Sequence, residues 1–532
     1  MGIATCMALF RRRMLRRLVG VGARPLLCGL AVMGVFILYL MYTHPSGVHI
    51  VCECSEEVET QERVARYLDT LMAEVDPITN RTAEASVASF HPSLAIEFLT
   101  QQERRGRRCR NTPGVFSVRH RNAVWQEADV AGVTFLAFGA YYDDRDGEEG
   151  PLVRVLVMVE SPKPPTPTCH LWFEGDIAPT ATKAIRIDYI HWQERFPDVW
   201  LPYIVTCRAG RGHRGVPQVV SLVPHACAQS TNALRVLSVD RSKPKRDLAL
   251  CHKFIFNPSR DSSQRLAEWI EASRAWGVDR ITIYEAASHP NVAKVLRHYE
   301  AEGYLTLIPW MNPGSQPNVP HLHRLFYDTQ RYSLFTTENI PYTDCLLRHL
   351  ASHRYVGVWD VDEFLVPAPP FASIPDMVDA AKETALSIGV KPPTSYLARC
   401  SYFFDNLTEP ATSDLPEYLH LLRHVTRTVK FSPPKVFTKA IHDTSYALGL
   451  HAHFALLNLA GEVDRDHDLY HLYPTNEGYL GHYRPACQGE SQEECNLLFR
   501  PFTTEDTTLW KYREQIAGNT KKVLSKLGIV PP

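Results

Sequence analysis

The feature that most constrains the fold is a regular alternation of strand and helix patterns that begins near Leu248. Short runs rich in β-branched and aromatic residues alternate with segments in which apolar residues recur at helical spacing. Strands joined by helices run parallel, so the pattern predicts an α/β fold whose largely parallel sheet carries helices on both faces. In such sheets ligands bind beyond the carboxyl ends of the strands. The predicted strands are 248–256, 280–284, 304–308 and 355–359, and a helix is expected to open at Pro341.

The last of these strands leads directly into a cluster of acidic side chains. In "YVGVWDVDEFLVP", Asp360, Asp362 and Glu363 fall within four positions that apolar residues bound on both sides. Carboxylates this close repel one another, and holding them beside a core requires positive charge or hydrogen-bond donors. A hard divalent ion such as Mg²⁺ or Mn²⁺ would relieve the repulsion and keep coordination sites open for the oxygens of a diphosphate. The alternative is a turn-forming aspartate pair satisfied by backbone N–H groups.

Position, rather than the Asp-x-Asp pattern itself, singles out this cluster. The chain contains three other instances, at 144–146, 464–466 and 466–468, and these fall in polar, turn-like segments. Asp360 instead follows a predicted buried strand. We therefore expect the ligand site at Asp360 and Asp362.

The first residues of the chain predict a membrane anchor. Residues 1–52 contain no Asp or Glu, and six arginines precede the uncharged apolar run 26–42. As a helix this run would span roughly 25 Å, near the short end of what a bilayer needs. Arginines on its N-terminal flank favour a cytoplasmic tail over 1–25, with the rest of the chain across the membrane. A cleaved signal peptide is the alternative to this type II membrane protein of the secretory pathway.

Three further segments complete the predicted organisation. Residues 43–112 are polar with mixed charge and are interpreted as a stem. Residues 113–245 contain short β-rich runs between Pro, Gly and Asp turns, and they predict a β-rich luminal domain. The α/β domain is expected over 246–500, and a C-terminal segment over 501–532 follows it.

Cysteine usage agrees with an oxidising compartment. Eleven of the thirteen cysteines lie after the anchor, so several disulfides are expected. Because eleven is odd, at least one thiol is free or pairs between chains. Cys52 and Cys54 lie close to the membrane, where a disulfide-linked homodimer and a local or unpaired thiol are equal alternatives. The net charge of −1 gives no support for nucleic acid as a partner.

An ordered set of motifs carries a resemblance to a known family. The segments "LAEWIEASRAWGVDRITIYE", "VLRHYEAEGYLTLIPW", "YTDCLLRHL", "VGVWDVDEFLVP" and "LGHYRP" resemble glycosyltransferase family 92, and so do "FGAYYDDR" and "VRVLVMVE" in the β-rich part. The similarity covers roughly residues 113–490. It implies a Golgi membrane enzyme of type II topology whose luminal catalytic domain has a GT-A fold.

The resemblance also implies a chemistry. It implies UDP-galactose as the nucleotide-sugar donor, Mn²⁺ or Mg²⁺ as the metal, and inversion at the anomeric carbon to give a β-galactoside on a glycan or glycoprotein acceptor. The family's Asp-x-Asp motif falls on Asp360 and Asp362. Asp362 is the better candidate for direct metal contact, while Asp360 would act through water or the donor ribose, and Glu363 would orient the loop. A catalytically inactive luminal glycan-binding protein of the same fold is the alternative.

Further ligands are expected from the C-terminal half. A GT-A site often takes a third metal or pyrophosphate contact from a histidine, and His482 in "HYR" is the first candidate, with His451 in "ALGLHAH" as its competitor. A histidine on an apolar stretch is, however, often a core residue. Arg484 and Lys435 are candidates for neutralising the departing diphosphate, with plain solvent exposure as the equal alternative.

The general base and the nucleoside contacts are assigned from position. Inversion requires a base for the acceptor hydroxyl, and Asp405 in "CSYFFDNLTEP" leads, ahead of Glu409 and Asp414. The sequence departs here from the Gly-containing loop expected of the family, and a turn role for Asp405 is equally open. Tyr284 and Glu285 close the second strand, where the uracil often lies in this fold, although "IYE" departs from the commoner "IYD/N".

Overall fold

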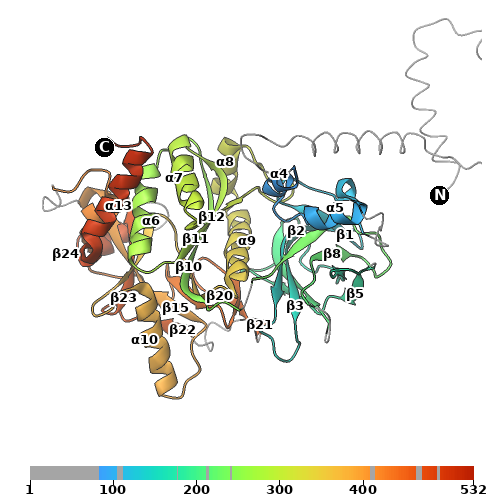
Figure 1. The fold of residues 1–532 in the computed structure, drawn as a ribbon. Coiled ribbons are helices and arrows are strands. Elements are labelled where there is room, and N and C mark those ends of the chain that lie inside the picture. Colours follow the sequence, from blue (N-terminus) through green and yellow to red (C-terminus); the bar gives the residue numbers. More distant parts are fainter. Residues whose placement is uncertain are drawn as a thin grey trace, which may run out of the picture. The chain divides into compact units, whose positions relative to one another are not determined.

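The fold is known from a computed structural model that describes residues 83–104, 112–176, 178–210, 215–239, 242–407, 414–459, 461–462, 470–487 and 492–531. All of these belong to one compact unit, and the predicted mixed α/β fold is confirmed (Figure 1). The predicted anchor at 26–42 lies outside the described residues. Within the ranges given, no helix combines the length and apolar character needed to cross a bilayer.

The α/β region is built on a seven-stranded sheet with the order β12-β11-β10-β13-β18-β15-β22. The four strands predicted from the alternation run parallel, whereas β18 runs antiparallel to both of its neighbours. The order of the strands along the chain reverses between β10 and β13. The strands are β10 (Arg246–Asn257), β11 (Arg280–Ser288), β12 (Leu305–Pro309), β13 (His353–Val358), β15 (Ser395–Ala398), β18 (Lys439–Asp443) and β22 (Tyr470–Leu472).

The helices follow the predicted signals, with one exception. Gly277 and Gly303, which follow α6 and α7, have φ values of 94° and 72°, the left-handed geometry that favours glycine after a helix. The prediction that Pro341 opens a helix is wrong, because α9 begins at Arg331 and contains this proline. The helices are α4 (Ala83–Phe90), α5 (Ile96–Arg104), α6 (Ser263–Ala275), α7 (Pro290–Ala301), α8 (Pro320–Thr329), α9 (Arg331–His349), α10 (Ile374–Ser387), α11 (His420–Arg423), α12 (Gln492–Glu494) and α13 (Arg513–Lys526).

The two faces of the parallel sheet bury different cores. On β10, Leu248 and Leu250 pack in a cluster with residues of α6 and α7, while Ala249 and Cys251 belong to a cluster that contains residues of α9. Successive side chains of a strand point to opposite faces, so this alternation places helices on both sides of the sheet. Burial on α9 extends around the helix and includes Pro341, and this packing offsets the backbone hydrogen bond that the proline cannot donate.

The β-rich region forms a nine-stranded sheet that shares a core with α9. Its order is β5-β4-β8-β9-β2-β3-β7-β6, and β1 also pairs with β2. Trp125 Nε1 donates to the Met311 carbonyl at 2.7 Å, so the two regions are joined by hydrogen bonds as well as by apolar contact. The strands are β1 (Gln126–Val130), β2 (Val133–Asp143), β3 (Leu152–Val159), β4 (Thr168–Trp172), β5 (Thr180–Lys183), β6 (Arg186–Tyr189), β7 (Leu201–Arg208), β8 (Val219–Val223) and β9 (Leu234–Leu237).

A five-stranded sheet with the order β14-β23-β16-β17-β24 completes the site. Its first strand starts at Glu363, and antiparallel pairing with β23 sets Glu363 opposite His482. Residues more than a hundred positions apart are therefore brought to the Asp-x-Asp turn. The strands are β14 (Glu363–Pro367), β16 (Cys400–Phe404), β17 (Thr426–Thr428), β23 (Gly478–Arg484) and β24 (Thr503–Glu505), and a small sheet contains β19 (Ala447–Leu450), β20 (Ala455–Asn458) and β21 (Gly461–Glu462).

The prediction of several disulfides is confirmed. Within the described ranges the bridges are Cys169–Cys207, Cys251–Cys345 and Cys487–Cys495, while Cys227 and Cys400 are free thiols. The bridge from Cys251 to Cys345 ties β10 to α9. Cys52 and Cys54 lie outside the described residues, so the disulfide-linked homodimer stays a prediction.

Candidate active site

The candidate site is a cavity of about 520 Å³ at the point where the strand order reverses. The end of β10, the turn after β13 and the start of α6 all contribute to its lining. This is the position at which open α/β sheets bind ligands. The charged side chains that line the cavity are Lys253, Arg260, Arg265, Arg324, Asp328, Asp360 and Asp362.

Two lysines, of which Lys439 is buried and Lys253 is half-buried, supply positive charge to the acidic cluster. Lys439 of β18 places Nζ 3.0 Å from Asp360 Oδ2 and 3.0 Å from Glu363 Oε2. Lys253 of β10 places Nζ 3.5 Å from Asp360 Oδ1 and 3.3 Å from Glu338 Oε2 on α9. The repulsion that the sequence implies for Asp360 and Glu363 is thus relieved by the protein itself.

His482 connects this arrangement to the exposed carboxylate of the motif. Its Nδ1 lies 3.7 Å from Glu363 Oε1 and its Nε2 lies 3.6 Å from Asp362 Oδ2. Acidic and basic groups therefore alternate without interruption, and we call this set the alternating charge network. Its members, in order of contact, are Glu338, Lys253, Asp360, Lys439, Glu363, His482 and Asp362.

The network fixes the ionisation of its inner members. Burial would raise the pKa of Asp360, but Lys253, Lys439 and His252 outweigh burial and hold that pKa well below its usual range. Burial would likewise lower the pKa of Lys439, and Asp360 with Glu363 reverses this, so the pKa is raised above its ordinary value. Both side chains are consequently charged at neutral pH.

Asp362 and His482 fit the ligand set of a divalent ion. The Asp362 side chain is 57% exposed and lines the cavity, whereas that of Asp360 is 19% exposed. Asp360 Oδ1 is buried and accepts no hydrogen bond from the described residues, which leaves it available to a cation or its water. Glu363 beside His482 Nδ1 matches the carboxylate that commonly orients a metal-binding imidazole.

The structure places the other predicted ligands differently. His451 Nε2 accepts from Trp192 Nε1 at 3.1 Å, so His482 is the histidine beside Asp362. Arg484 ends β23 and its guanidinium lies 5.8 Å from the centre of the Tyr402 ring. Lys435 is exposed and its Nζ lies 4.8 Å from the centre of the Tyr470 ring.

The predicted nucleoside contacts are not brought to the cavity. Tyr284 is fully buried and its hydroxyl donates to Asp344, which also pairs with Arg348 at 2.6 Å on the same helix. Glu285 pairs with Arg297 at 3.2 Å at the end of β11. Neither Tyr284 nor Glu285 is among the residues that line the cavity.

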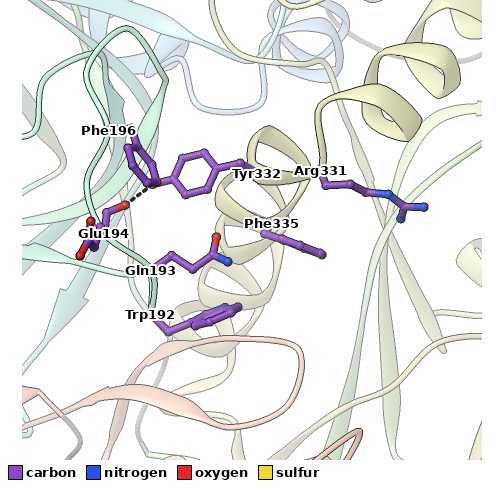
Figure 2. Close-up of a pocket in the computed structure, with 7 residues that line it drawn as sticks. All are labelled: Trp192, Gln193, Glu194, Phe196, Arg331, Tyr332 and Phe335. Atoms are coloured by element: carbon purple, nitrogen blue, oxygen red, sulfur yellow. Dashed lines mark hydrogen bonds between the residues drawn. The ribbon is translucent and has the colours of Figure 1, made fainter. Parts of the chain in front are cut away.

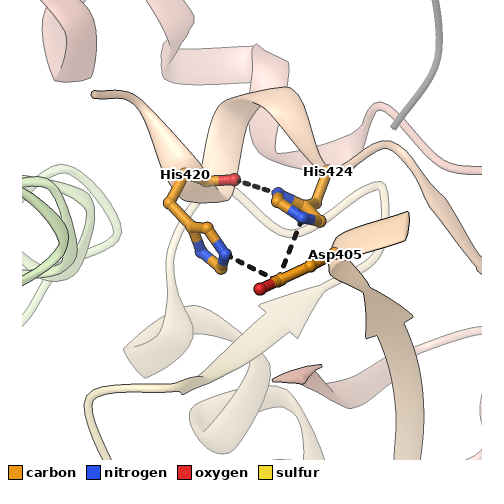
Figure 3. Close-up of side chains that lie close together, drawn as sticks. All are labelled: Asp405, His420 and His424. Carbon is orange, nitrogen blue, oxygen red and sulfur yellow. Dashed lines mark hydrogen bonds and ion pairs between the residues drawn. The ribbon is translucent and has the colours of Figure 1, made fainter. Parts of the chain in front are cut away.

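Asp405, the predicted base, lies in a separate cluster with two histidines (Figure 3). It follows β16, and its Oδ1 lies 3.0 Å from His420 Nε2 and 3.3 Å from His424 Nε2. Its Oδ2 accepts from Arg265 at 3.3 Å. The imidazoles of His420 and His424, together with Arg265, hold the pKa of Asp405 well below its usual range, which makes it a weak proton acceptor.

Of the two weaker candidates for the base, Asp414 lies within the described residues. Asp414 is paired with Arg513 of α13. Glu409 falls outside the described residues.

A second hollow, of about 500 Å³, shares no lining residue with the cavity at the Asp-x-Asp turn (Figure 2). It is formed by the loop after β6 and the first turns of α9, and Tyr332 donates its hydroxyl to the Glu194 carbonyl across it. Its lining is largely aromatic: Trp192, Phe196, Tyr332 and Phe335, with Gln193, Glu194 and Arg331. None of the predicted site residues lines this hollow.

Sequence reasoning missed the lysines and Glu338. Lys253 stands in "LCHKFIF", where a charge near the end of an otherwise apolar strand was a usable signal. Lys439 and Glu338 offered no comparable signal, because their burial follows only from the pairing of β18 with β13 and from the packing of α9.

Together, the reversed strand order and the acidic turn define an open α/β protein with a site suited to a metal-bound phosphate ligand. The sequence profile of glycosyltransferase family 92 matches residues 246–520, which is more than half of the chain. The chain belongs to glycosyltransferase family 92.

Individual relatives match over shorter stretches. Two glycosyltransferase family 92 proteins of Caenorhabditis elegans are 33% identical over 73 residues and 34% identical over 79 residues. Each of these stretches spans 14% of this chain and 14% of the relative. A mycobacterial protein of known crystal structure aligns with 37% of this chain and 54% of its own at 14% identity, and its TM-score of 0.18 carries no argument about the fold.

Proposed function

We propose that this protein is a metal-dependent glycosyltransferase that moves a hexose from a nucleotide diphosphate to a glycan or glycoprotein acceptor. The finer proposal is galactose from UDP-galactose, transferred with inversion and with Mn²⁺ or Mg²⁺. The observation that carries it is the exposed Asp362 carboxylate beside His482, set in a cavity with four lysine and arginine side chains at the switch point of the sheet. Membership of family 92 supports the reaction class.

In this proposal Asp362 and His482 would hold the metal, with Asp360 close enough to contact it or its water. A divalent ion bound there would act as a Lewis acid on the diphosphate. The protein's own cations would share the negative charge of the leaving group, because Lys253 and Arg260 line the same cavity.

The network explains how the metal ligands are held in place. Lys439 and Glu363 are buried, and they fix Asp360 and His482 from behind through contacts of 3.0 and 3.7 Å. Side chains held this way lose little entropy when the donor binds, which favours a preorganised site. Asp405 is not a suitable base in this arrangement, because its carboxylate is engaged by His420, His424 and Arg265.

The proposal includes a location. Three disulfides among the described residues are typical of a protein that folds in an oxidising compartment. This supports a luminal catalytic region behind the predicted 26–42 anchor, in the Golgi membrane. Detection of a soluble form of the chain in the cytosol of cells that express it would contradict this location.

The test is transfer by the full-length protein, with Asp362→Asn as the variant. Several UDP- and GDP-sugars are offered with Mn²⁺ against fucose-, galactose- and GlcNAc-terminated glycans. We expect galactose transfer by the wild type and a loss of at least about 100-fold in Asp362→Asn, since metal stabilisation of the leaving group is worth several kcal/mol.

The matched control is Asp376→Asn, which removes an exposed carboxylate on α10. It should retain the wild-type rate. Undiminished transfer by a correctly folded Asp362→Asn protein would refute the site assignment. If the wild type transfers no sugar and UDP-galactose with Mn²⁺ leaves its Tm unchanged, the protein is the inactive glycan-binding form instead.

A further inference from the structure

The cluster of Asp405, His420 and His424 has a chemistry that the proposed transfer does not use. His420 and His424 are four residues apart on α11 and its C-cap, so both imidazoles lie on one side of the helix (Figure 3). Two histidines at this spacing are a recurrent way for a helix to present a pair of metal ligands. Asp405 approaches from the end of β16 and supplies a carboxylate between them.

The tautomer of His424 leaves a ligand atom free. Its Nδ1–H donates to the His420 carbonyl at 2.6 Å, so in the neutral ring the lone pair is on Nε2. That Nε2 is buried and has no hydrogen-bond partner among the described residues, and the side chain as a whole is only 7% exposed. A lone pair that faces a carboxylate oxygen at 3.3 Å is repelled, whereas a proton or a metal ion between the two atoms makes the contact attractive.

The separations are those of metal ligands. With bonds of about 2.0–2.2 Å, two ligands of a tetrahedral Zn²⁺ ion lie about 3.3 Å apart. Asp405 Oδ1 lies 3.0 Å from His420 Nε2 and 3.3 Å from His424 Nε2, and the three atoms all lie within 4.8 Å of one another. Small side-chain adjustments are enough to close such a site.

The surrounding groups support the same interpretation. Metal-binding histidines usually donate their second N–H to a carbonyl or carboxylate, as His424 does here, and metal-binding carboxylates are held by further donors. Arg265 donates to Asp405 Oδ2 at 3.3 Å and so leaves Oδ1 for the metal, although its positive charge weakens the site. His420 Nε2 lies 3.0 Å from Asp405 Oδ1, and the neutral tautomer with its proton on Nδ1 presents the Nε2 lone pair to a metal.

We propose that Asp405, His420 and His424 bind a divalent first-row transition metal, Zn²⁺ being the ion that fits, at a second site distinct from Asp362 and His482. The ion would join the end of β16 to α11. Because His420 also lines the cavity, it would fix one part of the cavity rim. This inference does not depend on the proposed transfer reaction.

The test measures metal content and cobalt spectra of the full-length protein in detergent. Chelator-treated protein is reloaded with Zn²⁺, dialysed and analysed by mass spectrometry, and parallel samples receive Co²⁺, whose absorption between 500 and 650 nm reports tetrahedral N/O ligands. The variants are His424→Ala and Asp405→Asn, and circular dichroism checks their folding. The asparagine in Asp405→Asn can still accept a hydrogen bond from His420. This variant therefore tests the site even if His424→Ala does not fold.

We expect each variant to bind about one Zn²⁺ fewer per chain than the wild type, with affinity at this site reduced at least about 100-fold. Asp362→Asn is the matched control and should keep this ion and the cobalt bands. Wild-type protein that takes up no Zn²⁺, or variants that keep the wild-type content, would overturn the proposal. So would loss of the cobalt bands in Asp362→Asn alone, since that result would place the ion at the donor site.

Discussion

The alternating charge network predicts that Lys439→Met is severely destabilising although it adds an apolar side chain to a buried position. Lys439 is 4% exposed, and its Nζ lies 3.0 Å from one oxygen of Asp360 and 3.0 Å from one oxygen of Glu363. Methionine fills a similar volume, so the change removes charge with little loss of packing. The buried Glu363 carboxylate and the half-buried Asp360 carboxylate then lose the cation that lay between them.

The expected loss follows from the burial of this contact. Removing one partner of a buried ion pair costs about 3–5 kcal/mol, because the remaining charge stays desolvated and unpaired. We therefore expect the free energy of unfolding to fall by about 3–5 kcal/mol. Lys253 still contacts Asp360 at 3.5 Å. Asp360 should therefore contribute less to the loss of stability than Glu363 does.

The measurement is urea unfolding of both proteins at neutral pH, followed by tryptophan fluorescence. Glu363→Gln in the Lys439→Met background removes one of the stranded charges and should recover a large part of the loss. Lys294→Met, at an exposed position on α7, is the matched control and should change stability by less than about 0.5 kcal/mol. A Lys439→Met protein as stable as the wild type would refute the view that this lysine neutralises the cluster.

Three further predictions test the scaffold. Burial lowers the pKa of His442 from 6.5 to about 3. As the pH falls, this histidine is therefore protonated in the unfolded chain before it is protonated in the folded protein, and up to about 4 kcal/mol of stability is lost between about pH 6.5 and pH 3. Acid unfolding of His442→Asn should show a shallower slope over this range, whereas the exposed His225→Asn should keep the wild-type slope. Cys345→Ala removes a bridge with a sequence separation of 94 and should lower the free energy of unfolding by up to about 4 kcal/mol in non-reducing urea titrations, whereas an unchanged midpoint would mean that the bridge does not form. Gly357→Ala would place a Cβ that clashes with the Trp359 ring and should cost about 1–3 kcal/mol in thermal unfolding, and an unchanged Tm would show that the ring moves aside freely.

Local patterns predicted the elements around the site well. The strands 248–256, 280–284, 304–308 and 355–359 lie within or overlap β10, β11, β12 and β13, because apolar runs with period two read out directly as buried strands. The start of the helix that contains Pro341 was predicted wrongly, at Pro341 instead of Arg331. A proline signal is usually an N-terminal one, but packing against two sheets can keep a proline inside a helix.

The site was predictable only in part. Asp360 and Asp362 were found because an apolar run typical of a buried strand leads directly into the acidic pair. His482 was supported by the resemblance alone, and its contact with Asp362 arises from the pairing of β14 with β23. Tyr284 showed the opposite outcome, since its place at a strand end suggested a ligand role while its hydroxyl bonds to Asp344 in the core.

The amino-acid sequence by itself determined where carboxylates cluster and which strand leads to them, since both are properties of neighbouring residues. Only the tertiary structure decided which positive groups meet those carboxylates. Lys253, Lys439 and His482 come from three strands of two sheets, and no local pattern encodes the pairings that bring them within 4 Å of the acidic turn. The same holds for Asp405 and His424, whose proximity depends on how the end of β16 packs against α11.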